Sequence, residues 1–381
     1  MCMRSNCLKL AALATLGAAA LSAQEAPLPS GSVNINLPKD SPVALLAMQS
    51  DQSRTTMRGA AMVLDLHMSL SLRNSGPNRI HGVTLRVVSQ EVTMGGKGSV
   101  TIPSLNIAPG DAFPVRIDMQ LVRPTQVAGG PLVQIDLDGV LFDNLGFYGP
   151  DRLNSRRYLT ACELEAQRDR DHFKRVLAQS GKEGLRRAMI DSLALQAESQ
   201  PMTVRVRRGS AVTAAAITGN ARMAQFAFVK IPGSPVEPVQ GSAVISGNEA
   251  HAPTVEVRNA ASRPVKYVEV GWVVRDQAGR EYLAGSLPST NLNLPAGNTT
   301  RLSQDSTLNF TIGGQPVNIR EMTGFVTQVE FADGKVWVPA RQSLDDPLLR
   351  KVMGPSAEEQ RLSELYRRKG IDALVEELKK Y

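Results

Sequence analysis

One pattern occurs twice in this chain of 381 residues, and it restricts the possible folds more than any other feature. Residues 70–74 and 254–259 both end in an Arg-Asn pair, and each is followed by a turn-like stretch and an apolar-rich run, at 80–88 and 265–274. Apolar residues match at equal distances after that pair: Ile80 and Val265, Val83 and Val268, Leu85 and Val270. This agreement indicates that the chain contains two related units.

Two later landmarks follow in the same order in both copies. Residues 105–110 correspond to 292–297, and residues 134–139 correspond to 328–334, both of which end in Asp-Gly. The shared segments alternate apolar and polar residues and are rich in Val and Ile, which is typical of half-buried antiparallel strands joined by tight turns. The sequence therefore predicts a mainly β fold with two related β-sandwich domains, and it places a hairpin turn at each Asp-Gly pair.

The second copy also resembles a known class of domain. The run 255–274, together with the Leu-Asn-Leu-Pro-Ala-Gly turn at 292–297, is similar to the short immunoglobulin-like sandwiches of bacterial extracytoplasmic proteins, including the FxLYD-type domains. The resemblance covers the second copy and, more faintly, the first. It implies an interaction or spacer module with no catalytic residues to carry over.

Apolar residues change to helical spacing between residues 151 and 199, with an interruption at Gly181. The recurring positions are Leu159, Cys162, Ala166, Phe173, Val176 and Leu177, then Leu185, Met189, Ile190 and Leu193. This pattern predicts a helical hairpin inserted between the sandwiches. The predicted division is a signal peptide at 1–23, a first sandwich at 24–150, the hairpin at 151–200, a second sandwich at 201–344 and a helical tail at 345–381.

The N-terminus has the pattern of a secretory signal peptide. Arg4 and Lys9 precede an apolar run at 10–21, and small residues follow, so we expect cleavage after Ala23, with Ala20 as an alternative. No later stretch is long and apolar enough to cross a bilayer, so we expect no transmembrane span in the mature chain. The sequence predicts an exported protein, periplasmic or extracellular. Only Cys162 remains after cleavage, and on a predicted helix it is expected to be a small buried residue.

The chain carries a formal net charge of +7, and the basic excess is concentrated in one region. Residues 151–210 contain thirteen Arg and Lys against eight Asp and Glu. One interpretation is an anionic partner, such as an envelope polysaccharide or a lipid surface, bound through Arg205, Arg207 and the helical hairpin. The other is a solvated, salt-bridged helical surface. Aromatic residues make up 4% of the chain, which leaves few platforms for stacking bases, and no nucleic-acid partner is predicted.

The tail is an amphipathic pair of short helices that needs a surface to cover. Ser356 opens it with a capping box, and Gly370 interrupts it. The strongest candidate contacts to another envelope or secreted protein are Leu365, Tyr366, Ile371 and Leu374. The alternative is that the tail docks on its own sandwich.

The two tryptophans are assigned different roles. Trp272 shares its strand face with Val270 and Val274 and is expected in the core. Trp337 follows the Asp333-Gly334 turn and is the better candidate for a surface contact.

The sharpest local motif is Ile-Asp-Leu-Asp-Gly-Val at residues 135–140, which resembles the nucleophile motif of haloacid-dehalogenase-type phosphatases. That resemblance implies Asp136 as nucleophile and Asp138 as acid/base, with Mg²⁺ between them and the phosphate. The surrounding β pattern does not fit the alternating β/α sheet that this chemistry requires, and an Asp-Gly turn explains both copies more simply.

The four histidines fall singly, without the spacing of metal ligands, and no nucleophile elbow is present. We therefore predict a non-enzymatic protein with no cofactor and no metal, which acts as a protein-interaction or structural module of the bacterial envelope or secretome. Binding of an anionic polysaccharide or lipid is the first alternative, and the phosphatase is a minor one.

Overall fold

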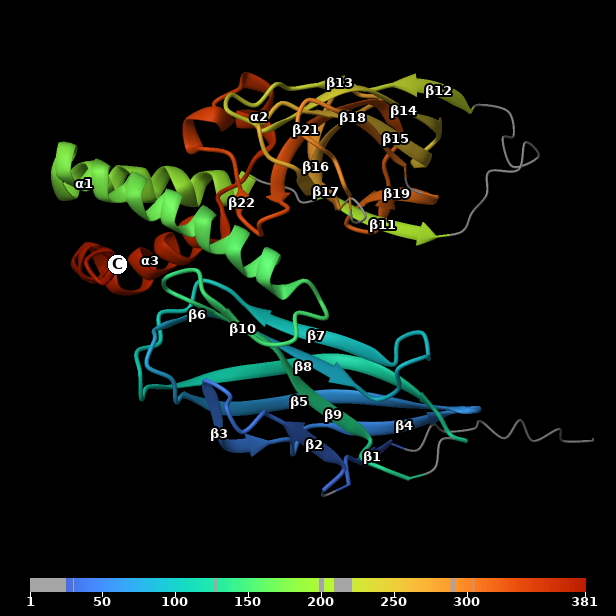
Figure 1. Ribbon diagram of the computed structural model, residues 1–381, viewed down its shortest axis with the longest axis vertical. Helices are drawn as coiled ribbons and strands as arrows, with labels where there is room; N and C mark the ends of the chain where they lie inside the picture. Colours follow the sequence, from blue (N-terminus) through green and yellow to red (C-terminus); the bar gives the residue numbers. More distant parts are fainter. Residues whose placement is uncertain are drawn as a thin grey trace, which may run out of the picture. The chain divides into compact units, whose positions relative to one another are not determined.

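The computed structural model describes residues 25–29, 31–126, 129–198, 202–208, 221–288, 292–303 and 305–381 (Figure 1). Over these residues the chain is mainly β, with four sheets in two similar halves, a long inserted helix and a helical C-terminus. The predicted fold class is therefore confirmed. The predicted signal peptide lies outside the described residues.

The first half contains two sheets. One has the strand order β1-β4-β5-β3, with β8 paired to β5, and the other has the order β10-β9-β6-β7, with β2 paired to β9. The strands are β1 (Glu25–Pro27), β2 (Val33–Asn36), β3 (Val43–Gln49), β4 (Arg54–Arg58), β5 (Ala61–Asn74), β6 (Ile80–Val88), β7 (Lys97–Ile102), β8 (Ala112–Pro124), β9 (Val133–Phe142) and β10 (Phe147–Tyr148). Alternate apolar residues of β5 and β8 are buried, as the period of a half-buried strand requires.

The second half repeats this plan. Its sheets have the orders β11-β19-β15-β14-β12 and β13-β21-β16-β17. In addition, β18 pairs with β15, β20 with β19 and β22 with β21. The strands are β11 (Thr203–Arg208), β12 (Arg222–Gln225), β13 (Ala227–Phe228), β14 (Val236–Ser246), β15 (Glu249–Asn259), β16 (Val265–Asp276), β17 (Glu281–Pro288), β18 (Thr299–Ser303), β19 (Ser306–Ile312), β20 (Gln315–Pro316), β21 (Ile319–Phe331) and β22 (Val336–Trp337). A parallel strand pairs with β9 in the first half and with β21 in the second, which strengthens the match.

A buried asparagine organises the same turn in both halves. The amide nitrogen of Asn259 donates to the carbonyl oxygens of Arg263 (2.8 Å) and Leu294 (3.0 Å), and its amide oxygen accepts from the backbone nitrogen of Ala261 (3.0 Å). The equivalent partners of Asn74 are Asn78 (2.9 Å), Ile107 (3.1 Å) and Gly76 (3.0 Å). Both asparagines are fully buried, so the Arg-Asn landmark marks a true structural equivalence.

The predicted equivalence of the two Asp-Gly pairs, at 138–139 and 333–334, is wrong. Asp333-Gly334 forms the predicted turn after β21, but Asp138-Gly139 lies inside β9. The equivalent turn of the first half comes later, because the backbone of Phe142 bonds to Gly146 as that of Phe331 bonds to Lys335, both at 2.9 Å. Tertiary packing explains Gly139 instead: a Cβ there would lie 2.3 Å from the ring of Phe147.

The predicted helical hairpin is α1 (Ser155–Glu198), whose helical backbone is interrupted at Gly181 (φ 65°, ψ −166°). After the short helices η2 (Arg341–Leu344) and α2 (Pro347–Val352), the tail forms α3 (Ala357–Leu378), which is interrupted at Gly370 (φ 81°). A positive φ suits glycine, which explains why both breaks were visible in the sequence. Ser356 caps α3 by accepting from the backbone of Glu359 (3.1 Å), as predicted.

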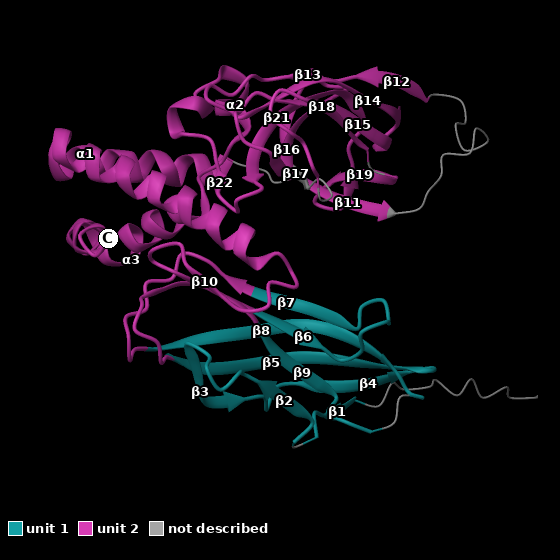
Figure 2. Cartoon of the chain, viewed as in Figure 1, with its two compact units in different colours: residues 1–73, 85–100, 112–137 teal, residues 74–84, 101–111, 138–381 magenta. Residues whose placement is uncertain are grey.

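The chain divides into two compact units, which have different colours in Figure 2. Unit 1 comprises residues 1–73, 85–100 and 112–137, and unit 2 comprises residues 74–84, 101–111 and 138–381. Unit 2 thus contains the second pair of sheets, all the described helices and the remaining segments of the first half. No described helix is both long enough and apolar enough to cross a membrane.

Candidate functional site

Charged side chains meet at the contact between α1 and α3, in a cluster that we call the brace: Glu163, Arg170 and Glu358. The guanidinium of Arg170 lies 2.5 Å from a carboxylate oxygen of Glu163 and 3.3 Å from one of Glu358. The three side chains are at most 2% exposed. The ring of Tyr381 covers the guanidinium at 4.0 Å, and His81 Nδ1 lies 3.1 Å from Glu163. The brace is therefore a buried network of opposite charges.

A second charged cluster continues the same contact. Arg341 lies 3.1 Å from the carboxylate of Asp169 and 2.9 Å from that of Glu359, so a single guanidinium links η2 to both α1 and α3. Arg168 also binds Asp169, at 3.1 Å. The hydroxyl of Ser192 donates to the other carboxylate oxygen of Glu359. These pairs hold three helical segments together.

Electrostatics keeps the carboxyl groups of Glu163 and Asp169 ionised. Burial raises the pKa of Glu163, but the adjacent imidazole of His81 and the charge of Arg170 outweigh it and hold that pKa below its usual range. Burial likewise opposes ionisation of Asp169, and its pKa is nonetheless lowered because Arg168 donates to it. Arginine stays protonated at neutral pH, so these paired groups do not exchange protons there. The arrangement stabilises structure and does not present an acid or a base.

Apolar packing surrounds the charged clusters. Phe173, Leu185 and Met189 of α1 are buried against Leu362, Leu374, Val375 and Leu378 of α3. The tail therefore docks on the helical insert of its own chain. Of the four predicted partner contacts, Leu374 is fully buried in this core, whereas Leu365, Tyr366 and Ile371 are partly buried against it.

The other predicted contact residues lie on the second half of the chain. Trp337, in β22, is partly buried and packs against two apolar clusters. Arg205 and Arg207 are exposed on the same face of β11, and Arg207 forms an ion pair with Glu249. The structure does not bring these residues together with the tail contacts in any described cluster.

The phosphatase-like motif has a different use for its second aspartate. Asp138 is buried, and its carboxylate accepts from the backbone nitrogens of Arg152 (2.9 Å) and Leu153 (3.2 Å) and from the hydroxyl of Ser155. These donors fix the chain as it enters α1. Asp136 accepts hydrogen bonds from Gln134 (2.8 Å) and Asn36 (3.1 Å).

Cys162 lies on α1 beside Tyr158 and Glu165. Burial raises the pKa of the Cys162 thiol to about 11, and the nearby carboxylate of Glu165 adds to the shift. The thiol is therefore protonated at neutral pH and lacks the thiolate that a nucleophile or a metal ligand needs. No group of three His, Cys, Asp or Glu side chains in the described parts of the chain is placed to hold a metal ion.

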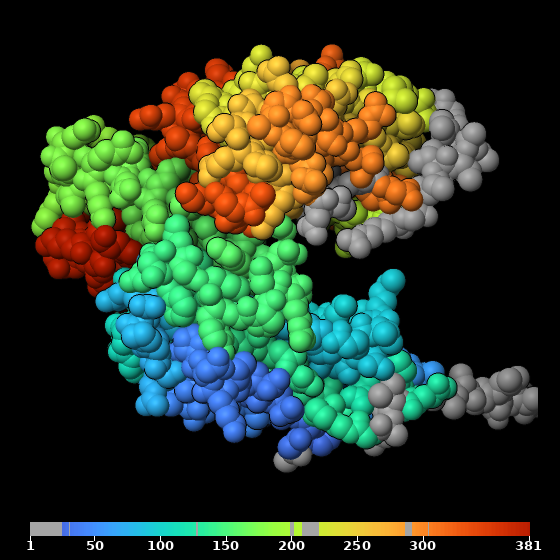
Figure 3. All heavy atoms as spheres, in the orientation of Figure 1, coloured from blue at the N-terminus to red at the C-terminus, as the bar shows by residue number. Residues whose placement is uncertain are grey.

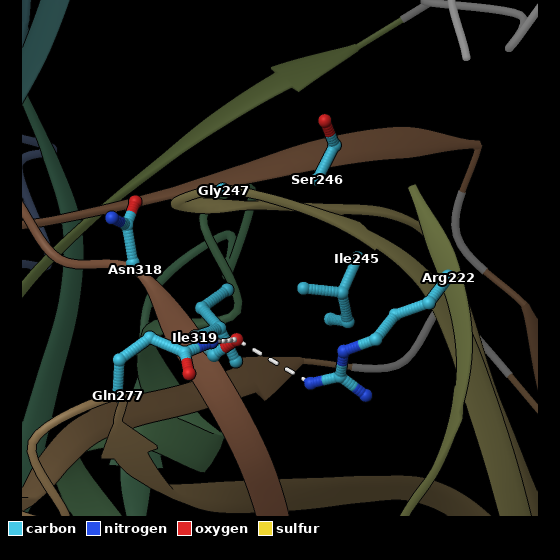
Figure 4. Close-up of a pocket in the computed structure, with 7 residues that line it drawn as sticks. All are labelled: Arg222, Ile245, Ser246, Gly247, Gln277, Asn318 and Ile319. Atoms are coloured by element: carbon cyan, nitrogen blue, oxygen red, sulfur yellow. Dashed lines mark hydrogen bonds between the residues drawn. The ribbon is translucent and has the colours of Figure 1, made fainter. Parts of the chain in front are cut away.

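A hollow of about 460 Å³ opens at one end of the second half, where β12, the β14–β15 turn and the start of β21 meet (Figure 4). Its lining consists of Arg222, Ile245, Ser246, Gly247, Gln277, Asn318 and Ile319. The guanidinium of Arg222 points across it and donates to the carbonyl oxygens of Ile319 (3.4 Å) and Arg320. Gln277 donates to the same carbonyl of Ile319 (3.3 Å). The side chains of Arg222 and Gln277 therefore link β12 and the end of β16 to the start of β21.

Sequence reasoning missed the brace because it treated charges on α1 as surface. Glu163 and Arg170 share the helical stripe of Ala166 and Phe173, at intervals of three or four residues. The sequence contained one signal of the brace: two residues of opposite charge, seven positions apart, lie on the apolar stripe of the helix.

No family model and no curated protein sequence matches this chain. Distant structural likenesses exist to the ApaA protein from Bordetella pertussis, at 15% identity over 37% of this chain and 91% of that one, with a TM-score of 0.17. A β-glucosidase from Kluyveromyces marxianus follows, at 10% identity over 71% and 45% of the two chains and a TM-score of 0.15. Red sea bream transglutaminase matches at 8% identity over 75% of this chain and 31% of the transglutaminase, with a TM-score of 0.12. The chain thus spans less than half of either enzyme, and TM-scores this low support no functional conclusion.

Proposed function

We propose that this chain is an exported, non-enzymatic protein of the bacterial envelope or secretome that serves as a protein-interaction or structural module. The observation that carries the proposal is the brace. Its carboxylates and guanidiniums are buried and paired between α1 and α3, so this concentration of ionisable groups stabilises the helical body. A helical body held in this way is suited to presenting a fixed surface.

Two sequence features support export and interaction. The pattern at residues 1–23 is that of a signal peptide, and the second half resembles immunoglobulin-like spacer and interaction domains of extracytoplasmic proteins. We expect the mature protein, made in a bacterial host with its own N-terminus, to start at Gln24. A chain that keeps residues 1–23 and stays in the cytoplasm would contradict the export.

The exposed face of β11 is the surface to test for a protein partner. Thr203, Arg205 and Arg207 are exposed on that face, and of the two arginines Arg207 forms an ion pair with Glu249. A photoreactive residue at Thr203 leaves both arginines in place, and it should crosslink a partner in the native envelope fraction. The same residue at the exposed Glu183 of α1 is the matched control.

The interaction is supported if the adduct forms from position 203, not from position 183, and disappears with Arg205→Ala and Arg207→Ala combined. Equal labelling from both positions would count against a specific surface. No adduct from either position, nor from Tyr366 or Trp337 replaced in the same way, would remove the interaction function.

The anionic-polymer alternative is favoured by one observation: Arg186 and Arg187 of α1 and Arg205 of β11 are all exposed. Binding to an anionic polysaccharide or to vesicles with anionic lipid should then weaken steeply with added salt, because exposed charges are screened over about 8 Å at physiological ionic strength. Arg186→Gln with Arg187→Gln should weaken it further, whereas Lys351→Gln, at another exposed site, should not. Salt-independent binding would exclude this alternative.

A further inference from the structure

The two most exposed large apolar side chains among the described residues lie two positions apart, in the loop between β6 and β7. Val92 is 89% exposed and Met94 is 96% exposed, whereas the next, Met223, is 65% exposed. In Figure 3 this loop is the cyan segment that projects from its surroundings. A single exposed apolar residue is ordinary on a protein surface, but two that are almost fully solvated on one short loop indicate a contact surface.

The backbone of this loop is closed by its own hydrogen bonds. The carbonyl oxygen of Gly96 accepts from the backbone nitrogens of Ser89 (2.8 Å) and Gln90 (2.9 Å). The nitrogen of Gly96 donates to the carbonyl oxygen of Thr93 (2.9 Å). A Cβ at position 96 would lie 2.3 Å from the carbonyl oxygen of Gln90, so only glycine allows this closure. The loop is therefore a built turn, and the two exposed side chains lie between the residues that close it.

Another hydrogen bond fixes the loop to the neighbouring sheet. The carbonyl oxygen of Gly95 accepts from the nitrogen of Val122, in β8 (2.9 Å). Just after β8, the nitrogen of Thr125 donates to the carbonyl oxygen of Ala60 (3.0 Å), in the hairpin that joins β4 to β5. Val122 and Thr125 are three residues apart, or about 10 Å, so the loop and the hairpin lie at the same end of unit 1.

Basic side chains accompany the exposed apolar ones. Lys97 directly follows the loop and is exposed, and Arg58 is exposed at the end of β4. The carboxylate within the loop, that of Glu91, forms an ion pair with Arg86. The exposed carboxylate of Glu25 lies on β1, which is the third strand from β8. This end of unit 1 therefore presents apolar side chains together with an excess of positive charge.

A tip of this kind suits a lipid bilayer. Val92 and Met94 are almost fully solvated, so a partner must surround each of them on nearly all sides. The interface of a bilayer does this for any projecting apolar side chain, whereas a protein would need a pocket shaped for both. Backbone polar groups are costly to place in a bilayer unless they are hydrogen-bonded, and those that close this loop are bonded within the protein.

We propose that the loop at residues 89–96 inserts Val92 and Met94 into the interface of a bilayer that contains anionic phospholipids, while Lys97 and Arg58 contact the headgroups. Each basic residue near such a surface adds attraction, and salt screens it. This inference goes beyond the proposed function, because insertion of the loop would stand whether or not β11 binds another protein.

The test is flotation of the mature chain with vesicles of phosphatidylcholine alone and with about one-third phosphatidylglycerol. The parent chain should bind the anionic vesicles more tightly. Val92→Ser and Met94→Ser should each weaken this binding by about tenfold, because each removes an apolar side chain from the bilayer. Lys97→Gln should weaken it by about fivefold and leave binding to the neutral vesicles unchanged.

A matched control removes an exposed apolar side chain from elsewhere in the chain. Met223→Ser, in β12, should bind both kinds of vesicle as the parent does. Val92 and Met94 are exposed, so thermal unfolding of their variants should match the parent and show that they remain folded.

An environment-sensitive dye would report which surface enters the bilayer. On Val92→Cys, in a Cys162→Ala background, its emission should shift to the blue when anionic vesicles are added. The same dye on Ala112→Cys is the control, because Ala112 is exposed at the start of β8, about 30 Å along the strand from Val122. Its emission should not change.

Three results would overturn the proposal: the parent chain does not float with the anionic vesicles, the double variant Val92→Ser with Met94→Ser floats as the parent does, or the dye at position 92 keeps its emission when the chain is bound. The last result would place the lipid contact on another surface, such as Arg186 and Arg187. A photoreactive residue at Met94 that crosslinks an envelope protein, without vesicle binding, would assign the loop to a protein partner instead.

Discussion

Replacing Asn259 by alanine should destabilise the second half of the chain severely for so small a change. The side chain is fully buried and makes three hydrogen bonds: to the carbonyl oxygens of Arg263 (2.8 Å) and Leu294 (3.0 Å), and from the backbone nitrogen of Ala261 (3.0 Å). Alanine removes all of them and leaves three backbone groups without these partners.

The magnitude follows from those three bonds. Each contributes about 1 kcal/mol net, so we expect the free energy of unfolding to fall by about 3 kcal/mol. For a unit of 150–250 residues, each 1 kcal/mol lowers the unfolding temperature by about 2–4 °C, which gives a decrease of about 6–12 °C.

Thermal and urea unfolding of the mature chain, followed by circular dichroism, would measure the effect. Asn74→Ala is the matched variant in the first half, because Asn74 makes the same set of contacts. Arg258→Ala is the control. Arg258 precedes Asn259 in the chain, and its exposed side chain pairs with the exposed Glu237, so loss of that pair should cost under about 0.5 kcal/mol.

The reasoning fails if Asn259→Ala costs less than about 1 kcal/mol, or no more than Arg258→Ala. Asn259→Asp offers a second check. The carboxyl keeps the shape and the acceptor but faces two carbonyl oxygens, so this variant should be less stable at pH 7, where the group is ionised, than at pH 4.

Three further predictions concern α1. Arg170→Met leaves Glu163 and Glu358 buried without their shared guanidinium and should lower the free energy of unfolding by about 3 kcal/mol in urea. The pKa of Glu163 is below its ordinary value of 4.5, so the stabilisation that its ionised carboxylate provides is complete above pH 4.5 and is lost as the pH falls through the lower folded pKa. Glu163→Gln should therefore make the free energy of unfolding depend less on pH in this acidic range. The pKa of Cys162 is about 11 in the folded chain, so alkylation by iodoacetamide at pH 8 should be about 100-fold slower than in the unfolded chain.

Controls distinguish each of these outcomes from a general effect. Arg186→Met removes an exposed pair with Glu183 and should change stability by less than about 0.5 kcal/mol. An equal loss from both arginine variants would mean that burial of the brace does not matter. An unchanged acid limb in Glu163→Gln would remove the role of that carboxyl, and fast alkylation of the folded chain would show that the thiol is accessible and ionised.

Local signals in the sequence were enough to predict most of the fold. Apolar alternation located the principal strands of both halves, and the Arg-Asn landmark identified the equivalent turns at Asn74 and Asn259. Breaks at Gly181 and Gly370 were predicted because glycine alone adopts those backbone angles at little cost. Such features depend on residues close in the chain, so a single sequence contains them.

The candidate site depended on contacts between distant residues. Glu163 and Arg170 have the composition of a surface helix, and only the docking of α3 makes them a buried pair. Asp138 followed by Gly139 has the composition of a turn, but three donors at the start of α1 and the ring of Phe147 keep it within a strand.

The sequence by itself therefore determined the strand pattern, the repeat and the helix breaks, because periodicity and backbone preference act over a few residues. Only the tertiary structure decided which charges are buried, which turn is equivalent to which, and that β3 is left at the end of its sheet. The physical reason is that burial and strand order are set by contacts with other elements of the fold, such as the contact of Arg170 with Glu358, 188 residues away, and a side chain's cost or gain depends on whether such a partner is there.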